Sequence, residues 1–323
     1  MNYNNEIITG DCLEVLRQLP DQIFQSCITS PPYWGLRDYG VDGQLGLEST
    51  PEEYTAKMVE IFREVRRTLR DDGTLWLNLG DTYSAHKDCK SVSQTLAIGG
   101  KNERAHVIEK GKSVSRNSRI MKSIGLKNKD LIGIPWMVAF ALRNDGWYLR
   151  CDIIWSKPNP MPESVTDRPT KAHEYVFLMS KSQRYYYDAD AISELASYPQ
   201  FGYKNASAYN GKNSKQDALG DRRYTGFNER WRENPTQTRN ARSVWEIPTQ
   251  PYPEAHFATY PEKLVNKCIL AGTKEGDLIL DPFAGSCTTG YRAKEMRRKF
   301  TMIELKPEYV KLGHRRMQQE VLI

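Results

Sequence analysis

The sequence predicts an α/β protein with a doubly wound, mostly parallel, Rossmann-like sheet that carries inserted segments. Short apolar strands alternate with amphipathic helices over residues 6–83 and 261–318 of the 323-residue chain. Such alternation is typical of a parallel sheet with helices on its faces. Two long stretches in between are polar and basic, which indicates insertions into one domain. With 39% apolar and 27% charged residues, the chain is neither a membrane bundle nor a disordered polymer.

The N-terminal elements are expected to be a strand at 6–9, a helix at 12–19 and a strand at 26–29. The helix carries leucines on one side, and each strand is a short apolar run. Pro31 and Pro32 end the second strand, because proline lacks a backbone donor and restricts the residue before it.

The clearest helix is expected at 51–70. Thr50 is a good N-cap, Pro51 suits the first helical position and Glu53 completes a capping box. Apolar residues recur at helical spacing, namely Tyr54, Met58, Ile61, Phe62, Val65 and Leu69. An Asp-Gly pair then ends the helix, and residues 74–79 form a buried strand.

The remaining elements continue the same pattern. In order, they are a helix near 135–144, strands at 148–155, 173–179 and 184–187, a helix at 261–271, a strand at 277–280, a helix at 287–298, a strand at 300–303 and a helix at 307–318. The stretch from 261 onward is the most regular, and it predicts strands that lie parallel in one sheet.

The net charge of +6 conceals an uneven distribution. Residues 84–130 carry +7 and residues 201–245 carry +5, so the rest of the chain carries −6. Aromatic residues are interleaved with the basic ones in the second segment. Such inserts are either solvated loops or surfaces that neutralise phosphates and contact bases.

Several classes of site are not expected. The six cysteines form no C-x-x-C pair and no His pair has ligand spacing, which argues against a zinc site and a disulfide framework. The N-terminus lacks the features of a signal peptide. The longest apolar run, at 131–142, is far shorter than the roughly 20 residues that span a bilayer. We therefore expect no metal, no membrane contact and a cytoplasmic location.

One motif is DPFAGSCTTG at 281–290, a small-residue turn between a strand and a helix. Ligands of parallel sheets bind at the carboxyl ends of strands, where helix N-termini supply free N–H groups. Tyr291 stands where a phosphate loop needs lysine, and no G-x-G-x-x-G pattern is present, which argues against a nucleoside triphosphate site. Glu304, at the end of the next strand, either accepts hydrogen bonds from ribose hydroxyls or caps a turn.

The other motif is TSPPYW at 29–34, which places prolines and aromatics at the end of a buried strand. It could be a rigid structural turn. The chemical interpretation concerns a nucleobase amine, a poor nucleophile because its lone pair is conjugated with the ring. Ser30 and the carbonyl near Pro31 would accept the N–H bonds and favour a tetrahedral nitrogen, while Tyr33 would stack on an extruded base.

These two motifs resemble those of the amino-group DNA methyltransferases that use S-adenosylmethionine. Their catalytic tetrapeptide is S/D/N-P-P-Y/F and their cofactor loop is D-P-F-x-G-S-G-T-T. The resemblance covers roughly residues 6–83, 131–190 and 243–323. Because the catalytic motif precedes the cofactor motif, the order is similar to that of the permuted group, in which a target-recognition region lies between them.

The resemblance implies a role for each matching residue. It implies a catalytic group that consists of Ser30, Pro31, Pro32 and Tyr33. It implies a cofactor-binding group that consists of Asp11 for the adenine amine, Glu304 for the ribose, and Asp281, Phe283, Gly285, Ser286 and Thr288 around the methionine part. Cys287 departs from the family, which usually has glycine there, and its side chain is expected to narrow the pocket.

The domain organisation follows from the same resemblance. Residues 1–83, 131–190 and 246–323 form the catalytic domain, 84–130 a basic insert that clamps DNA, and 191–245 the target-recognition region. The DNA-binding candidates are Arg222, Arg223, Arg230, Arg232, Arg239, Lys112, Arg116 and Arg119. His173 and Glu174 lie either near the cleft or, as we favour, in a packed structural pair. Residues 185–187 are expected to be an edge strand.

The function implied is site-specific methylation of an exocyclic amine in double-stranded DNA. Ser30, a neutral hydroxyl where other members have a carboxylate or an amide, favours cytosine N4 over adenine N6. The alternatives are an RNA or protein amide methyltransferase and a non-catalytic DNA-binding module. A companion restriction endonuclease is a partner to expect, and the oligomeric state stays open.

Overall fold

The computed structural model describes residues 3–36, 40–41, 43–84, 125–195, 238–250 and 260–318. These residues fall into two compact units, one of residues 1–187 with 243–323 and one of residues 188–242. Among the described residues, no helix combines the length and apolar character needed to cross a membrane.

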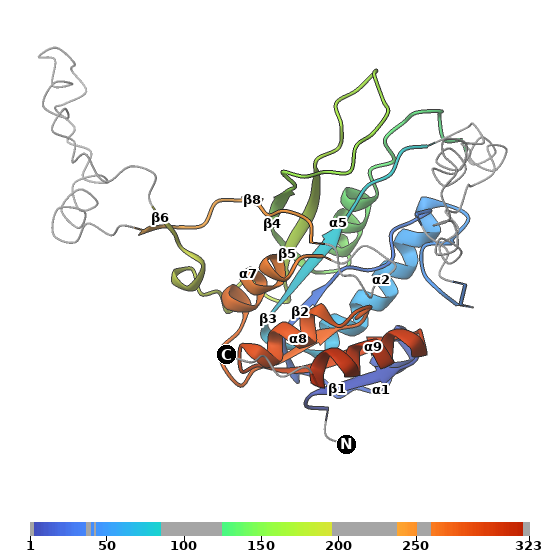
Figure 1. The fold of residues 1–323 in the computed structure, drawn as a ribbon. Coiled ribbons are helices and arrows are strands. Elements are labelled where there is room, and N and C mark those ends of the chain that lie inside the picture. The colour runs from blue at the N-terminus through green and yellow to red at the C-terminus, as the bar shows by residue number, and fades with distance from the viewer. Residues whose placement is uncertain are drawn as a thin grey trace, which may run out of the picture. The chain divides into compact units, whose positions relative to one another are not determined.

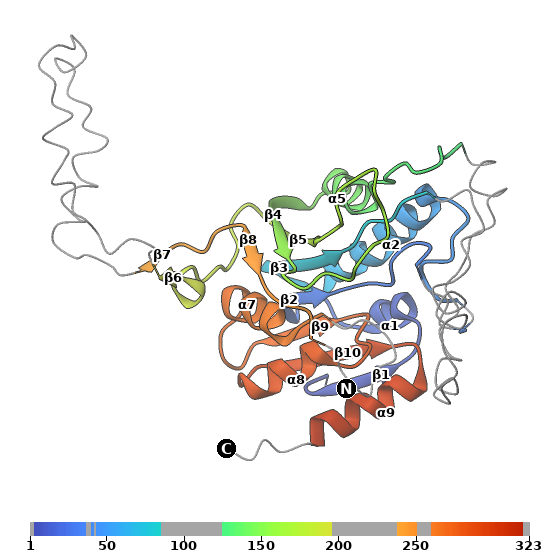
Figure 2. The ribbon, with the colours of Figure 1, turned by 45° about the horizontal axis from the view of Figure 1, so that its top comes forward.

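The larger unit is built on one eight-stranded sheet (Figure 1). In spatial order the strands are β1 (Glu6–Thr9), β10 (Lys299–Glu304), β9 (Leu278–Asp281), β2 (Phe24–Thr29), β3 (Leu69–Leu79), β5 (His173–Ser180), β4 (Tyr148–Ser156) and β8 (Val244–Glu246). Figure 2 shows β9, β10 and β1 on the opposite side of β2 from β3. Only β5 runs antiparallel to its neighbours, so the predicted fold class is confirmed.

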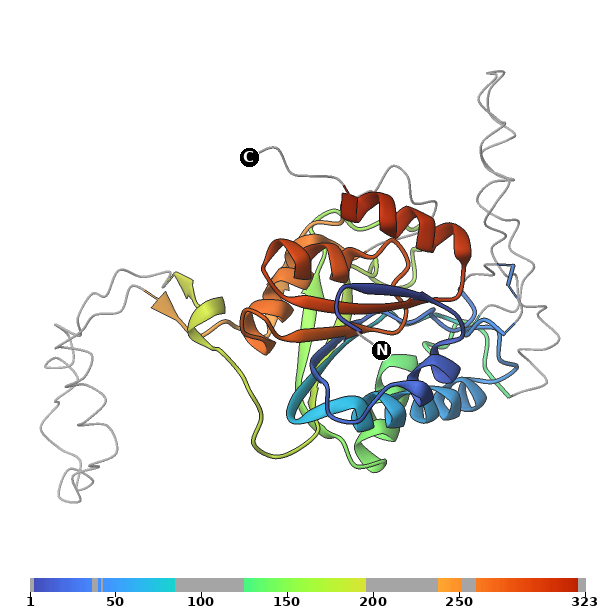
Figure 3. The same cartoon turned by 90° about the horizontal axis from the view of Figure 1, so that it is seen from below.

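Helices cover both faces of this sheet. One layer contains α1 (Cys12–Gln18), α2 (Pro51–Thr68) and α5 (Ile134–Asn144), which pack in that order. The other contains α7 (Glu262–Gly272), α8 (Thr288–Glu295) and α9 (Pro307–Gln318). Figure 3 shows the two layers on opposite sides of the strands. The core between them is apolar, with Leu16, Phe62, Leu77 and Phe177 fully buried.

A local signal explains where α2 begins. The Thr50 hydroxyl accepts a hydrogen bond from the Glu53 amide at 3.1 Å and begins α2 as the capping box predicts. The strand β3 begins earlier than the sequence predicts, because Leu69 already pairs with Phe24 and the strand continues through the Asp-Gly pair.

One predicted element is wrong. Residues 184–187 form no strand, because the open edge of β4 is occupied by β8 instead. The Tyr186 amide donates to the Asp72 carbonyl at 2.9 Å, and the Tyr187 ring stacks 6.4 Å from Trp76. The strand β8 crosses the predicted domain boundary at 245/246.

The smaller unit is described at its two ends. It contains a 3-10 turn (Asp190–Ile192) and a short antiparallel pair of β6 (Glu194–Leu195) and β7 (Thr238–Arg239). In that pair Glu194 lies opposite Arg239, and its carboxylate lies within 3.3 Å of Arg242. The assignment of target recognition to this region stays a prediction.

Candidate active site

The parallel strands bring the residues of both motifs to one edge of the sheet. The strands β1, β10, β9, β2 and β3 run in the same direction, so their carboxyl ends meet there. At or just after these ends lie Asp11, Glu304, Asp281, Ser30 and Asp81. The two motifs, separated by some 250 residues in sequence, therefore lie at adjacent strand ends, with the Thr29 hydroxyl 2.6 Å from Asp281.

The β2 loop, defined as residues 30–35, is held by hydrogen bonds to residues that follow it in the chain. The Tyr54 hydroxyl of α2 donates to the Pro32 carbonyl at 2.9 Å, and the buried Trp34 indole donates to the Glu48 carbonyl at 3.0 Å. Gly46 approaches the loop so closely that a Cβ there would lie 2.9 Å from the Tyr33 carbonyl oxygen. The loop therefore keeps one shape without a regular strand or helix.

The Tyr33 side chain turns back over the end of β3. Its ring lies against Gly80, where a Cβ would be only 2.6 Å from the ring. Its hydroxyl donates to Glu174 at 2.7 Å and accepts from the Asn78 amide at 2.6 Å, with Ser30 Oγ 3.3 Å away. Burial, followed by the nearby Glu174 charge, raises the pKa of Tyr33 well above its usual value, so the phenol keeps its proton.

Glu174 is the residue that sequence reasoning missed at this site. It is the second residue of the antiparallel strand β5 and forms an ion pair with Lys157; the side chains of Glu174 and Lys157 are 16% and 17% exposed. Burial raises the pKa of Glu174, but the Lys157 charge and the hydrogen bonds from Asn78 and Tyr33 outweigh it and lower the pKa below its usual value. Of the two interpretations of Glu174, the place near the cleft therefore holds and the packed pair with His173 does not, because its carboxylate faces Tyr33 of the β2 loop.

Asp281 lies beneath the other motif, with its side chain fully buried. Its carboxylate accepts hydrogen bonds from Thr29 at 2.6 Å, Thr289 at 2.7 Å, Tyr260 at 2.9 Å and the Phe283 amide at 3.1 Å. Burial raises the pKa of Asp281, and the hydroxyl donors oppose that rise. Its oxygens are engaged by the protein, so it holds the β9–α8 loop, defined as residues 282–287, in place.

Glu304 and Asp11 lie side by side at the ends of β10 and β1, where Thr9 pairs with Glu304. The Glu304 carboxylate accepts from the Gly285 amide at 2.7 Å and the Lys306 amide at 2.8 Å. Burial raises its pKa, and those amides oppose the rise. Asp11 is half-buried, and one of its oxygens caps α1 through the amides of residues 13 and 14.

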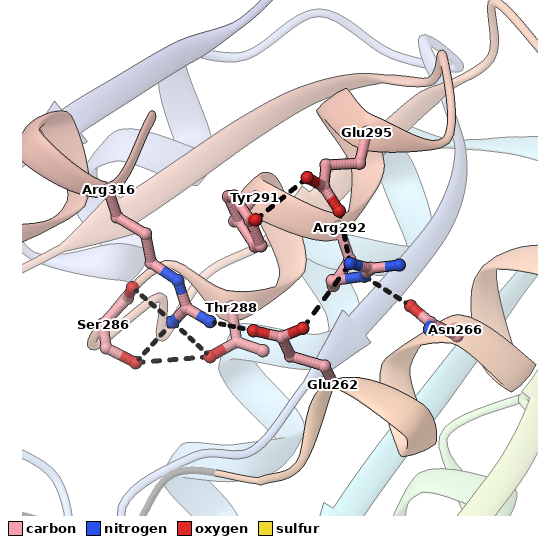
Figure 4. Close-up of polar contacts among 8 residues, drawn as sticks. All are labelled: Glu262, Asn266, Ser286, Thr288, Tyr291, Arg292, Glu295 and Arg316. Carbon is pink, nitrogen blue, oxygen red and sulfur yellow. Dashed lines mark hydrogen bonds and ion pairs between the residues drawn. The ribbon is translucent and has the colours of Figure 1, made fainter. Parts of the chain in front are cut away.

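A buried arginine that sequence reasoning also missed supports the β9–α8 loop (Figure 4). Arg316 of α9 is 6% exposed on its side chain and donates to the Ser286 carbonyl at 3.3 Å and to the Thr288 hydroxyl at 3.0 Å. Its other nitrogen pairs with Glu262 at 2.7 Å. The signal that could have found it is a charged residue on the otherwise apolar side of α9, beside Gly313 and Met317.

Cys287 explains why glycine is usual at its position. Its backbone has φ of +57°, in the left-handed region that glycine adopts without cost. The thiol is fully buried against α9, where a Cβ on Gly313 would lie 2.4 Å from the sulfur. Burial raises the pKa of this thiol, so it stays neutral. The expectation that Cys287 narrows the pocket is wrong, because the side chain packs between the loop and α9.

Comparison with known proteins decides the family. Residues 24–315 match the family model of the N6 and N4 amino-methyltransferases, described as DNA methylase. The chain belongs to this family. The methyltransferase is 45% identical to the type II methyltransferase M.SmaI of Serratia marcescens over 97% of its own length and 90% of that protein.

Two solved structures have the same fold. The PvuII DNA methyltransferase, described as cytosine-N4-specific, matches with a TM-score of 0.62 and 19% identity, over 99% of this chain and 88% of that one. A Thermus thermophilus protein, described as a putative DNA modification methylase complexed with S-adenosyl-L-methionine, matches with a TM-score of 0.57 and 22% identity, over 98% and 94% of the two chains. At these identities the likeness shows the fold alone.

The methyltransferase is a site-specific DNA methyltransferase of the type II kind, and its cofactor is S-adenosylmethionine. The cofactor supplies an electrophilic methyl group on a sulfonium when bound. The residues at the strand ends fit it chemically. Asp11 and Glu304 are carboxylates with acceptor sites beyond the bonds described above, as an amine and ribose hydroxyls require. The partly buried Phe283 adds an apolar side chain to the β9–α8 loop.

Of the predicted DNA-binding residues, only Arg239 lies within the part of the chain that the structure describes. Arg222, Arg223, Arg230, Arg232, Lys112, Arg116 and Arg119 lie outside the described residues. Arg239 is described, and its guanidinium lies 3.7 Å from Glu194. A carboxylate that also pairs with Arg242 therefore offsets part of its charge.

Proposed function

We propose that this methyltransferase transfers the methyl group to N4 of cytosine in double-stranded DNA. The observation that carries the proposal is the neutral Ser30 hydroxyl at the start of the β2 loop. The Glu174 carboxylate is hydrogen-bonded to Tyr33 and Asn78, and within the described residues it reaches Ser30 only through those two side chains. A single hydroxyl oxygen suits one N–H of a cytosine amine, whereas a carboxylate is the stronger acceptor for an adenine amine.

The β2 loop orients the target nitrogen. Ser30 Oγ and the carbonyl of Pro31 accept the two N–H bonds, which aims the nitrogen lone pair and favours a tetrahedral nitrogen. Pro31 and Pro32 keep the carbonyls in a fixed direction, and Tyr54 holds the second of them. Tyr33, whose ring is only partly buried, offers its remaining surface to the extruded base.

The other strand ends hold the cofactor. Glu304 accepts from the ribose hydroxyls and Asp11 from the adenine amine. Phe283, Gly285, Ser286 and Thr288 surround the methionine part, and Asp281 and Arg316 keep that loop in shape. What supports these roles is the convergence of both acids and the small-residue loop at one edge of the sheet.

Sequence recognition is assigned to residues 191–245 and a DNA clamp to residues 84–130. Their support is the basic charge with interleaved aromatics, because lysines and arginines neutralise phosphates. A restriction endonuclease that cuts the same site is the partner this function calls for, since a type II methyltransferase protects DNA from such an enzyme. A DNA substrate supports a cytoplasmic location in association with the nucleoid.

The test is methylation of unmethylated DNA with S-adenosylmethionine, followed by mass spectrometry of the nucleosides. We expect N4-methylcytosine, and strongly reduced product with Ser30→Ala or Tyr33→Ala. N6-methyladenine would overturn the choice of base and show that Ser30 does not decide it. If DNA stays unmethylated while RNA or protein is methylated, the substrate class would be wrong.

A further inference from the structure

We propose that Glu174 is a positioning residue that fixes the Ser30 hydroxyl as a hydrogen-bond acceptor for the target amine. The inference rests on the proposed role of Ser30, but it holds for cytosine and adenine alike, since both amines present N–H bonds. It assigns a task to an ion pair, Lys157–Glu174, that lies outside the two motifs at 29–34 and 281–290.

The first step concerns the charge of Glu174. Its partner Lys157 and the donors around it keep the carboxylate ionised. An ionised carboxylate only accepts hydrogen bonds. The Tyr33 hydroxyl, 2.7 Å away, must therefore point its single hydrogen at Glu174.

The second step concerns Asn78, whose amide nitrogen lies 3.0 Å from the same Glu174 oxygen. The opposite amide orientation would place two oxygens in contact, so the acid also fixes this side chain as a donor. The nitrogen donates to Tyr33 at 2.6 Å and faces Ser30 Oγ at 3.2 Å.

The third step reaches Ser30. Because Tyr33 has committed its hydrogen to Glu174, Ser30 Oγ, 3.3 Å away, can bond to it only by donating. The Asn78 nitrogen has two hydrogens for three acceptors, Glu174, Tyr33 and Ser30, and it offers Ser30 no acceptor. The serine hydrogen is thus directed away from the target, and a lone pair of Oγ is left to accept from the amine.

The consequence is that the hydrogen bond between Ser30 and Tyr33 has one fixed direction, with Ser30 as the donor. Without the acid, the hydroxyls of Ser30 and Tyr33 could pair in either direction. In the wrong direction the serine hydrogen would point toward the N–H bonds of the amine. A partly buried ion pair is a costly way to gain stability, because desolvation offsets most of its attraction. Here it supplies direction to three polar side chains beside the reaction.

The experiment is Glu174→Gln, which keeps the shape but can donate as well as accept. In single turnover with saturating DNA and cofactor, we expect the methyl-transfer rate to fall about 10- to 100-fold. S-adenosylmethionine and DNA affinities should stay within about twofold, and the thermal unfolding midpoint should show that the variant is folded. The matched control is Glu64→Gln, which removes an acid paired with Arg67 on α2 and should keep the full rate.

A double-mutant cycle tests the path through Tyr33. In a Tyr33→Phe background the relaying hydroxyl is gone, so we expect Glu174→Gln to cost less than about threefold in rate. Full multiplication of the two effects would overturn the relay. So would an unchanged rate in Glu174→Gln, or a rate loss explained by weaker cofactor binding or unfolding. If the wild type itself methylates no base, the proposed function fails, which is a distinct result.

Discussion

Two loops follow adjacent strands of one sheet, and side chains of opposite charge support them. The β2 loop is hydrogen-bonded to the Glu174 carboxylate, which belongs to the antiparallel strand β5. The β9–α8 loop and the start of α8 accept hydrogen bonds from the Arg316 guanidinium, which belongs to the last helix, α9. A carboxylate only accepts hydrogen bonds, so Glu174 takes hydrogens from the β2 loop and leaves its hydroxyl oxygens able to accept from a ligand. A guanidinium only donates, so Arg316 occupies acceptor oxygens of the β9–α8 loop. The support behind each loop therefore decides what its hydroxyls can offer a ligand.

The largest effect that would break this comparison is expected from Ser30→Ala. Removing one acceptor that faces the target amine should lower the single-turnover rate by about 100- to 1,000-fold, as losses of one orienting group in other active sites do. Affinity for S-adenosylmethionine should stay within about twofold. The control is Ser182→Ala, which should keep full activity. Ser182 follows the carboxyl end of β5, at the opposite end of that strand from Glu174. A rate within about tenfold of the wild type would contradict the role given to Ser30.

Arg316→Met tests the other loop. It removes donors to Ser286 and Thr288 and leaves Glu262 without this partner, so we expect a loss of about 2 kcal/mol in the free energy of unfolding. Cofactor affinity, measured by calorimetry, should fall by about tenfold. Arg297→Met removes an exposed arginine 3.8 Å from Glu275 and should change neither quantity measurably. Unaltered affinity in Arg316→Met would mean that the loop keeps its shape without α9.

A smaller effect is expected from Gly80→Ala. The added Cβ would lie 2.6 Å from the Tyr33 ring, so the ring must shift, and we expect this shift to weaken the hydrogen bond from the Tyr33 hydroxyl to Glu174. We expect the methyl-transfer rate to fall about tenfold while cofactor affinity is retained. A crystal structure of the variant would show the displaced ring, and full activity with a displaced ring would refute the importance of the Tyr33 bond.

The smallest effect concerns Gly313, the counterpart of Gly80 beneath the other loop. Alanine usually stabilises a helix interior by about 1 kcal/mol over glycine, but here its Cβ would lie 2.4 Å from the Cys287 sulfur. We expect Gly313→Ala to lose about 1–2 kcal/mol in urea unfolding. Adding Cys287→Gly should restore the loss, since it removes the clash and suits the left-handed backbone. Strictly additive effects would show that the two residues do not compete for the same space.

The two loops also differ in how far the sequence predicts them. For the β9–α8 loop, Asp281, Gly285 and Glu304 belong to one continuous strand–helix–strand unit. Its local signals therefore bring them together, and the Gly285–Glu304 bond follows from the fold class. The role of Arg316 was not predicted, because its burial depends on how α9 packs against α8, and no local sequence pattern indicates that packing.

For the β2 loop the motif is predictable, but its support is not. Glu174 lies 141 residues from Tyr33 and reaches it only because β5 enters antiparallel between β3 and β4. A parallel strand there would start at the opposite edge of the sheet. The sequence around His173 and Glu174 does not indicate that β5 is reversed, so it could not decide between a place near the cleft and a packed pair.

The most direct test measures two quantities on the same preparations of Glu174→Gln and Arg316→Met. These are the dissociation constant of S-adenosylmethionine and the single-turnover rate at saturating cofactor and DNA. We predict that Glu174→Gln lowers the rate and keeps the dissociation constant. Arg316→Met should raise the dissociation constant and regain most of the rate at saturation. If both variants alter the same quantity to the same extent, the two loops are not supported separately and the account is contradicted.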